Sequence, residues 1–327
     1  MLTTTTLKHL LAGAALGATL LGSQAVMAAD YTLKFGHLAN EQNIWNKAAL
    51  KFKELVEANS DGRIEVQVFP NEQLGSEMDV INSIQLGTAD MTITGESLQN
   101  WAPKAAMMAV PYAFRDSEHL RKAVEGDIGK QIEQQIEEKA GLVTIAWFEG
   151  GPRELTSNQP IKKPSDLDGL RLRVPNVPLF VDTWQALGAK PTPMAFSEVF
   201  TSLQQGTIDG QENPLSLIES ASFNEVQDYV NMTDHVRSWI YVVIGKNKLE
   251  SMPEDLQEVV LDAAQQMQSY EAKLFDEDQK RLRNALEEAG MEFVEVDQKA
   301  FADEAEPAVK ASLNDEQQKL YEAIQDL

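Results

Sequence analysis

The chain has 327 residues, enough for one large or two ordinary domains, with 51 acidic residues, 28 basic residues and a formal net charge of −23. A surface this negative argues against nucleic acid and anionic lipid as partners, because their phosphates would be repelled. The chain has no cysteine, which excludes disulfides and thiol chemistry.

Residues 1–28 are typical of an export signal. Lys8 is the only formal charge in this stretch, "LLAGAALGATLL" is a short apolar run, and "AVMAAD" offers small residues at a cleavage site. The apolar run is shorter than the roughly 20 residues that a membrane span needs. We therefore expect cleavage near Ala28 and an exported protein, with an uncleaved anchor as the alternative.

The first half of the chain alternates strands and helices. Strands are predicted over residues 31–37, 61–69 and 89–95, and the intervening residues 44–56 and 76–87 have the apolar spacing of amphipathic helices. This β-α-β-α-β order predicts an α/β fold with a mostly parallel sheet covered by helices.

A second α/β series begins near Arg153, after a predicted strand that ends in the glycines of "GLVTIAWFEGG". Its predicted strands are residues 153–158, 169–175, 190–194 and 207–214, and its predicted helices are residues 179–188 and 196–206. No disordered linker separates the two series. We therefore expect two domains that exchange strands or helices.

The stretch from Ser251 to Gly290 predicts an unusually long helix. Ser251 and Glu254 have the spacing of a capping box, Gly290 is a natural stop, and no glycine or proline interrupts the residues after Pro253. At about 1.5 Å per residue, such a helix would be roughly 50 Å long. A single helix lying across two domains is one interpretation, and a kinked pair of helices or a coiled-coil arm is the other.

A search for catalytic motifs finds none. The four histidines, His9, His37, His119 and His235, have no metal-ligand spacing. The chain also lacks the G-x-S-x-G, G-x-G-x-x-G and Walker motifs. We therefore predict no catalytic residues, no metal and no cofactor, and look for binding groups instead.

Two arginines are candidates for holding a small organic acid. In "GLRLRVPNVP" the alternation predicts a strand that ends at Pro175 and carries Arg173 near its carboxyl end, and Arg153 follows another predicted strand. Ligands of open α/β sheets lie beyond the carboxyl ends of the strands. A guanidinium can grip a carboxylate with two parallel hydrogen bonds. For Arg171 a solvated strand face is the better interpretation, and Asn213 in "GQENP" can both donate and accept.

Several segments of the sequence resemble those of a known protein family. They are "FPNEQLG", "GTADMTITGES", "VPYAF", "RELTSNQPIKKPSDLDGLRLRVPN", "GAKPTPMAFSEVFTSLQQGTIDGQENP" and "SMPEDLQEVV". In this order they resemble the periplasmic substrate-binding proteins of TRAP (tripartite ATP-independent periplasmic) transporters, in the branch with sialic-acid and dicarboxylate binders. The resemblance covers nearly the whole chain after residue 28.

The resemblance implies a two-domain, periplasmic-binding-protein-like (Venus-flytrap) fold with one long helix spanning both domains. It places domain I at residues 30–150 plus 239–278 and domain II at residues 151–238 plus 279–327. The ligand would lie in the cleft, the domains would close over it, and the closed form would dock on a permease.

The resemblance also implies site residues. Arg173 matches the arginine that pairs with the ligand carboxylate, and Arg153 matches a second arginine. Asn213 matches a ligand-contacting asparagine, Phe196 an aromatic that packs on the ligand, and Glu96 a glutamate near its polar groups. Core packing remains an alternative for Phe196, and helix capping remains one for Glu96.

The sequence departs from the sialic-acid binders at His37 and Leu38, where those proteins place small polar contacts. It also departs at Trp147, Phe148 and Glu149, which we expect near the cleft. A small sugar acid, such as a uronate or aldonate, is therefore the expected ligand, with sialic acid or a C4-dicarboxylate as the alternative within the family. An enzyme acting on small organic acids, or a sensory protein that hands its ligand to a receptor, is the alternative outside it.

The implied partners are the small and large membrane subunits of a TRAP permease, driven by an ion gradient that is usually sodium. We expect a monomeric periplasmic protein that does not bind nucleic acid.

Overall fold

The computed structural model describes residues 29–327, so the predicted export signal and its cleavage site lie outside the described residues. The strands are β1 (Tyr31–Gly36), β2 (Ile64–Phe69), β3 (Met91–Thr94), β4 (Leu142–Ser157), β5 (Arg171–Val174), β6 (Lys190–Pro193), β7 (Gly210–Pro214), β8 (Tyr229–Gly245) and β9 (Glu292–Val294).

The α-helices are α1 (Ile44–Asn59), α2 (Glu77–Gln85), α3 (Ser117–Glu125), α4 (Asp127–Ala140), α5 (Pro178–Ala186), α6 (Val199–Gln204), α7 (Leu215–Ser220), α8 (Lys246–Glu250), α9 (Glu254–Glu288), α10 (Gln298–Ser312) and α11 (Asp315–Gln325). The short 3-10 helices are η1 (Glu96–Asn100), η2 (Pro103–Ala109), η3 (Pro164–Leu167), η4 (Phe196–Glu198) and η5 (Phe223–Glu225).

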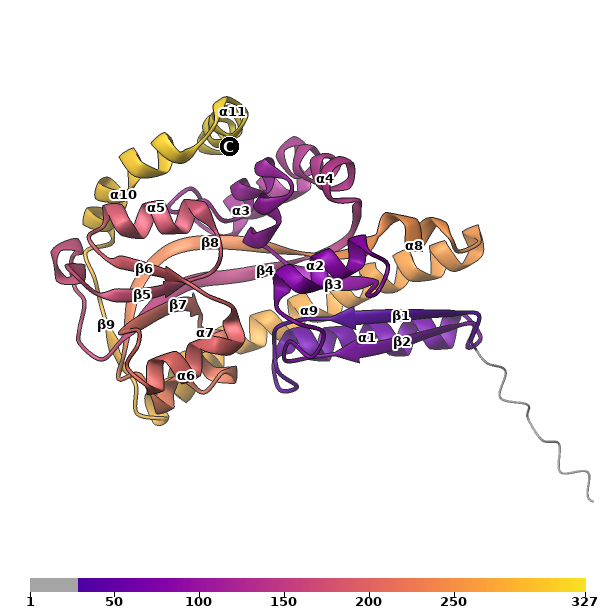
Figure 1. Ribbon diagram of the computed structural model, residues 1–327, viewed down its shortest axis with the longest axis horizontal. Coiled ribbons are helices and arrows are strands. Elements are labelled where there is room, and N and C mark those ends of the chain that lie inside the picture. The colour runs from indigo at the N-terminus through magenta and orange to yellow at the C-terminus, as the bar shows by residue number, and fades with distance from the viewer. Residues whose placement is uncertain (1–28) are drawn as a thin grey trace, which may run out of the picture.

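The strands form one sheet in the order β2-β1-β3-β8-β4-β7-β5-β6, with β9 beside β8. At one end, β1 pairs parallel with β2 and β3, and at the other, β5 pairs parallel with β6 and β7. We call the end with β1–β3, α1, α2 and η1 the first lobe, and the end with β5–β7, η4 and α5–α7 the second lobe (Figure 1). The predicted parallel α/β arrangement is confirmed within each lobe.

Two long antiparallel strands, β4 and β8, run through both lobes and connect them (Figure 1). The prediction of two strands separated at the glycines before Arg153 is wrong, because β4 continues from Leu142 to Ser157. The glycines make a bulge instead of an end: the pairing with β8 shifts between Glu149 and Gly151, and Gly151 has a φ of 76°. At Gly150, a Cβ would lie 2.5 Å from the Ser238 hydroxyl and 3.1 Å from the Ser238 carbonyl oxygen, so a side chain here would require Ser238 to shift.

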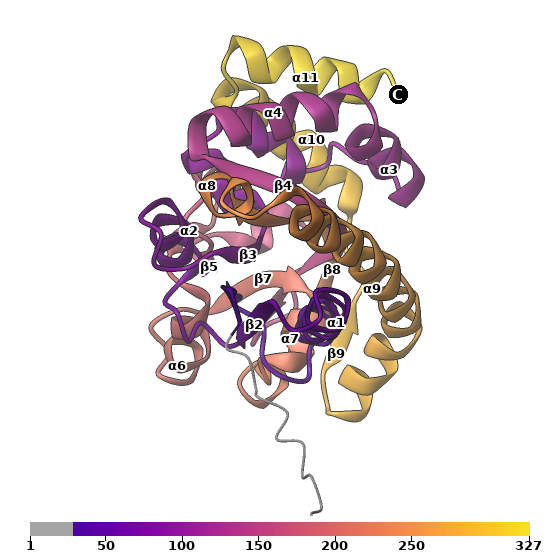
Figure 2. The ribbon, with the colours of Figure 1, turned by 90° about the vertical axis from the view of Figure 1, so that its right-hand side faces the viewer.

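The long helix α9 is a single element of 35 residues that lies along the side of the molecule and reaches both lobes (Figures 1 and 2). Its predicted stop is confirmed, since Gly290 follows the helix end with a φ of 101°. The predicted capping box is wrong. Pro253 is the N-cap, and the Ser251 hydroxyl instead donates to the Lys248 carbonyl at 2.7 Å, at the end of α8.

The hydrophobic core differs between the two faces of the sheet. On one face a single cluster includes residues of α2–α5, α10 and α11 and runs through both lobes. On the other face there are two clusters, one around β1–β3, α1 and the first half of α9, and one around α6, α7 and the end of α9. Strand β8 separates the faces, since Tyr241 and Val243 point to the continuous cluster whereas Val242 and Ile244 point to the other side.

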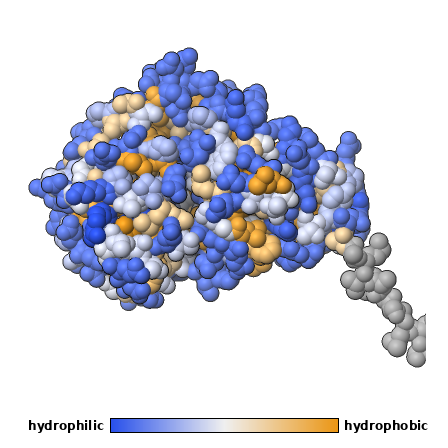
Figure 3. Space-filling view, viewed as in Figure 1, coloured by the Kyte–Doolittle hydropathy of each residue, from blue (hydrophilic) through white to orange (hydrophobic). Residues whose placement is uncertain are grey.

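The last helix, α11, packs against η2 and α4, so the end of the chain lies beside helices that precede β4. Every helix within residues 29–327 is too short or too polar to cross a bilayer. The face in Figure 3 is mainly hydrophilic, with scattered hydrophobic residues, in keeping with the high net charge.

Candidate ligand-binding site

A cleft with about 720 Å³ of empty space lies between the two lobes. The first lobe contributes Leu38, Trp45, Glu72, Ser76, Glu77, Met78, Ile93, Thr94, Gly95, Glu96 and Ser97 to its walls. The second lobe and the connecting strands contribute Arg153, Arg173, Pro175, Asn176, Met194, Ala195, Phe196, Asn213, Pro214, Leu217, Ser238 and Ile240. All five residues that the sequence predicted for a ligand site therefore line one cleft.

Arg173, on β5, is a buried cation without a carboxylate partner. Only 4% of the residue is exposed, and its Nε and Nη2 donate to the Met194 carbonyl at 3.2 and 2.8 Å. Among residues 29–327 no carboxylate oxygen lies within 4 Å of its guanidinium. Burial lowers the pKa of Arg173 to about 10; the charge of Arg153 adds to this effect, and Glu212 opposes it. A bound anion would relieve the cost of this buried charge.

Arg153, on β4, is already paired within the protein. Its Nε lies 2.6 Å from Glu212 Oε2, its Nη2 lies 2.9 Å from Glu212 Oε1, and its Nη1 lies 3.2 Å from Glu96 Oε1. Burial disfavours the Arg153 charge, but Glu212 and then Glu96 outweigh burial and raise its pKa. Arg153 lines the cleft as predicted, but two carboxylates within the protein already accept its hydrogen bonds, unlike Arg173.

Glu212 is held from a second side by a buried histidine. His235 Nε2 lies 2.9 Å from Glu212 Oε2, and His235 Nδ1 lies 2.9 Å from the Thr233 hydroxyl. Burial lowers the pKa of His235, so the neutral ring donates from Nε2 to Glu212 and accepts from Thr233. Burial raises the pKa of Glu212, but the Arg153 charge and these hydrogen bonds bring it down to about 2.

Asn213 and Phe196 shape the second-lobe wall. The Asn213 side chain is 2% exposed, accepts from Arg153 Nη2 at 3.1 Å and donates to Gln211 Oε1 at 2.6 Å. The Phe196 ring packs edge-on against Phe223 with centroids 5.8 Å apart, and the Arg173 guanidinium lies 6.0 Å from its centre. Because Phe196 is only half-buried and lines the cleft, core packing alone does not describe it.

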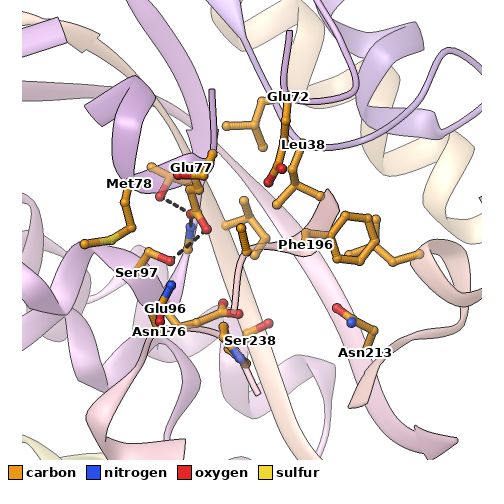
Figure 4. A pocket seen from close by; sticks show the side chains of 18 of the residues that line it. Leu38, Glu72, Glu77, Met78, Glu96, Ser97, Asn176, Phe196, Asn213 and Ser238 are labelled. Atoms are coloured by element: carbon orange, nitrogen blue, oxygen red, sulfur yellow. Dashed lines mark hydrogen bonds between the residues drawn. The ribbon is translucent and has the colours of Figure 1, made fainter. Parts of the chain in front are cut away.

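The first-lobe wall carries acidic groups (Figure 4). Glu96 opens η1, but its carboxylate bonds to Arg153, and Gly95 is the helix N-cap without a side-chain cap bond. Glu77 accepts hydrogen bonds from the Thr94 hydroxyl, from the Gly95 amide at 3.2 Å and from the Ser97 hydroxyl at 2.7 Å. Burial and the neighbouring Glu96 charge raise the pKa of Glu77.

Of the two departures noted in the sequence, only one lies at the cleft. Leu38 lines the cleft, whereas His37 is buried behind it with 2% exposure. The expectation that Trp147, Phe148 and Glu149 lie near the cleft is wrong, since none of them lines it. Phe148 belongs to the core around β1–β3, and the Glu149 carboxylate accepts from the Ser117 hydroxyl.

Other cleft residues gave no usable signal in the sequence. Glu77 looked like an ordinary acidic residue in the first turn of a helix, and Glu72 like one of many surface carboxylates. Ser238 is buried with a hydroxyl that has no hydrogen-bond partner among residues 29–327, and it faces the cleft (Figure 4). Glu212 could have been predicted as the partner of Arg153. It precedes Asn213 in the segment "QENP", and a buried arginine requires an anion.

This arrangement suits an acid that also carries hydroxyl groups. Arg173 can bind one carboxylate, while Glu77 and Glu96 can accept hydrogen bonds from hydroxyls, and Phe196 and Leu38 can contact carbon. The described part of the chain, residues 29–327, contains no group of three or more acidic, histidine or cysteine side chains arranged to hold a metal ion.

Comparison with known families identifies the family to which the chain belongs. Residues 35–316 match the model of the bacterial extracellular solute-binding proteins of family 7. The chain belongs to this family, and the predicted resemblance to TRAP solute-binding proteins is confirmed.

Individual relatives extend over most of the chain. Solute-binding protein RD1_1052 of Roseobacter denitrificans is 59% identical over 304 residues, which are 93% of this chain and 94% of that protein. The 2,3-diketo-L-gulonate-binding periplasmic protein YiaO of Escherichia coli is 35% identical over 278 residues, 84% of each chain.

Solved structures support the two-domain fold. The crystal structure of RD1_1052, a TRAP periplasmic solute-binding protein with bound L-galactonate, has a TM-score of 0.90 and covers 91% of this chain and 99% of that one. A TRAP periplasmic solute-binding protein from Polaromonas sp. JS666, bound to D-erythronate, is 34% identical and has a TM-score of 0.86. The match covers 91% of this chain and 99% of that one. The predicted fold class, including the long helix across both domains, is therefore confirmed.

Proposed function

We propose that this protein captures a sugar acid in the periplasm and delivers it to a TRAP permease. The observation that carries the proposal is Arg173, a buried guanidinium without a carboxylate partner among residues 29–327, in a cleft whose opposite wall has carboxylates. A ligand carboxylate would pair with Arg173 in two-point geometry, and hydroxyls would donate to Glu77 and Glu96.

The charge balance of the cleft favours one carboxylate over two. Arg153 is ion-paired with Glu212 and Glu96, so Arg173 is the cleft arginine that lacks an ion-pair partner among residues 29–327. A C4-dicarboxylate would bring its second negative charge toward Glu77 or Glu96, which is unfavourable in a buried site. An aldonate or uronate places hydroxyls there instead, and relatives that bind L-galactonate and D-erythronate support this class.

We further propose that Asn213 and Phe196 complete the ligand contacts and that the lobes close over the ligand. The boundaries follow the sequence prediction, with residues 30–150 plus 239–278 as one domain and residues 151–238 plus 279–327 as the other. The ligand would bridge Arg173 in one domain and Glu77 in the other, which favours the closed form.

Export, docking and the absence of turnover belong to the same proposal. The leader would be removed near Ala28, the protein would act as a monomer, and the closed form would dock on the small and large permease subunits. The ligand would be released unchanged, which distinguishes binding from the enzymatic alternative. A ligand recovered chemically intact after prolonged incubation, by NMR, is the expected result.

A thermal-shift screen tests the ligand class. A ligand at about 100 times its Kd stabilises a protein by roughly 2.7 kcal/mol. We expect L-galactonate and D-glucuronate to raise the melting temperature more than succinate, N-acetylneuraminate, ethanolamine or galactose. Galactose is the matched control for galactonate, because it leaves Arg173 buried and unpaired. A neutral sugar or an amine as the tightest ligand would contradict the role of Arg173.

A further inference from the structure

Glu72 reaches from the first lobe to the second across the cleft. It lies in the loop between β2 and α2, and its Oε2 accepts a hydrogen bond from the Ser197 amide at 3.1 Å. Ser197 belongs to η4 of the second lobe, directly after Phe196. The Glu72 side chain also lines the cleft, beside Leu38 of the first lobe (Figure 4).

The backbone that carries Glu72 is held in an unusual conformation. Asn71 and Glu72 have φ angles of 57° and 54°, consecutive left-handed values that side-chain-bearing residues rarely adopt. The Asn71 amide donates to the Ala39 carbonyl at 2.8 Å, and the Glu72 amide donates to the His37 carbonyl at 3.1 Å. This turn is therefore attached to the loop that places Leu38 in the cleft. Such conformations persist where the surroundings fix them, often at ligand sites and switches.

The segment that Glu72 contacts is also held by Arg173. Arg173 donates twice to the Met194 carbonyl and lies beside the Phe196 ring. The segment from Met194 to Ser197 is thus bound by Arg173 from its own lobe and by Glu72 from the opposite lobe. An acid bound to Arg173 would lie against the same segment.

We propose that Glu72 is a positioning residue that fastens the closed cleft and slows ligand release. This inference rests on the proposed function, since it requires a ligand whose binding closes the lobes. The hydrogen bond to Ser197 forms only when the lobes meet, so it stabilises the closed form and not the open one. Losing it raises the dissociation rate and leaves the association rate nearly unchanged.

The experiment uses L-galactonate as probe and three variants. Glu72→Ala removes the bridge, and Glu72→Gln keeps an acceptor of similar length. Glu198→Ala is the matched control, because the Glu198 carboxylate accepts from the Ala195 amide at 3.1 Å in the same segment but within the second lobe. Stopped-flow fluorescence gives the two rates. Spin labels at Asn59→Cys and Gln205→Cys, exposed sites in a chain without cysteine, report the distance between lobes.

We expect Glu72→Ala to dissociate about tenfold faster and to show a broader, longer distance distribution at saturating L-galactonate. Glu72→Gln should recover most of the difference, and Glu198→Ala should match the wild type. Equal rates for Glu72→Ala and wild type would overturn the assignment. Equal impairment of Glu72→Ala and Glu198→Ala would also overturn it, since local ordering of the segment would then explain the effect. A wild type that binds no sugar acid would overturn the proposed function itself, and the assignment of Glu72 with it.

Discussion

Arg153 and Glu212 form a buried two-point ion pair, with 2.6 Å from Nε to Oε2 and 2.9 Å from Nη2 to Oε1. They lie on the neighbouring strands β4 and β7, so the sheet itself brings them together. The pair gives the two cleft arginines different roles. Arg153 also holds Asn213, whereas Arg173 has no carboxylate partner among residues 29–327 and is the residue that we propose pairs with the ligand.

Replacement of Arg173 tests the carboxylate pairing. Arg173→Ala should cost about 2–5 kcal/mol of binding free energy, because a ligand carboxylate would be left buried and unpaired. This corresponds to roughly thirty- to several-thousand-fold in Kd. Arg173→Lys should also bind poorly, since an ammonium cannot reproduce the two-point geometry. Isothermal titration with L-galactonate measures both.

Arg171 is the control for this prediction. Its side chain is 45% exposed and pairs with Asp209 at the surface, away from the cleft, as the sequence interpretation expected. Arg171→Ala should bind normally. Near-normal affinity for Arg173→Ala would contradict the proposal that Arg173 pairs with the ligand carboxylate.

Removal of Glu212 should destabilise the fold. In Glu212→Ala, Arg153 and His235 lose their shared partner inside the protein, and breaking a buried ion pair costs about 3–5 kcal/mol. Urea unfolding monitored by circular dichroism gives the free energy of unfolding. Asp209→Ala breaks an exposed pair and should cost at most about 1 kcal/mol. If both variants lost the same stability, the buried pair would not have the structural role assigned here.

Glu154 should make stability depend on pH. Burial raises its pKa from 4.5 to about 8 in the folded protein. Folded protein then retains a proton that unfolded protein releases, so the stabilising contribution is complete below pH 4.5 and is lost as the pH rises to about 8. Glu154→Gln should therefore stabilise the protein more at pH 9 than at pH 5, by a few kcal/mol on the scale of about 1.4 kcal/mol per pKa unit.

The amide of Glu154→Gln can still accept the hydrogen bond that Glu154 receives from the Asp234 amide at 2.8 Å. The substitution therefore changes the charge with little loss of contact. Glu65→Gln, at an exposed position, is the control for the chemical change from carboxylate to amide. Parallel pH profiles for Glu154→Gln and wild type would show that Glu154 does not titrate as described.

Domain closure should be visible in solution. Asn100 donates to the Asn176 carbonyl at 3.1 Å and Asn43 donates to the Ser216 carbonyl at 3.3 Å, contacts between the lobes that opening would break. We expect small-angle X-ray scattering to show a smaller radius of gyration after addition of saturating L-galactonate. An unchanged radius would indicate a rigid pocket.

The sequence was sufficient for most strands and helices of the two α/β series, for α9 and for the position of Arg173, but it predicted neither β8 nor the helices α3, α4, α10 and α11. Alternation of apolar residues identified the strands, and the spacing from Pro253 to Gly290 identified α9. The prediction from sequence failed where one local pattern is compatible with two structures. The glycines after Glu149 looked like a strand end, but two glycines also permit a bulge, and only the pairing with β8 decides between these outcomes.

The site was only partly predictable for a related reason. With 51 acidic residues in the chain, no pattern distinguishes Glu77 or Glu72 from surface carboxylates. The neutralisation of Arg153 depends on Glu212 lying beside it across two strands, a long-range relationship that spacing does not contain. Trp147 and Glu149 are near Arg153 in sequence, but they lie on β4 before the bulge and away from the cleft.

The unbroken core on one face of the sheet has a thermodynamic consequence. Because that core continues through both lobes, opening the cleft would expose only the residues of the cleft walls and would leave the shared core buried. Heat capacity changes scale with the apolar surface that is hydrated. The proposed opening would therefore have a heat capacity change far below that of unfolding, so its enthalpy would stay nearly the same across the temperature range in which the protein is folded.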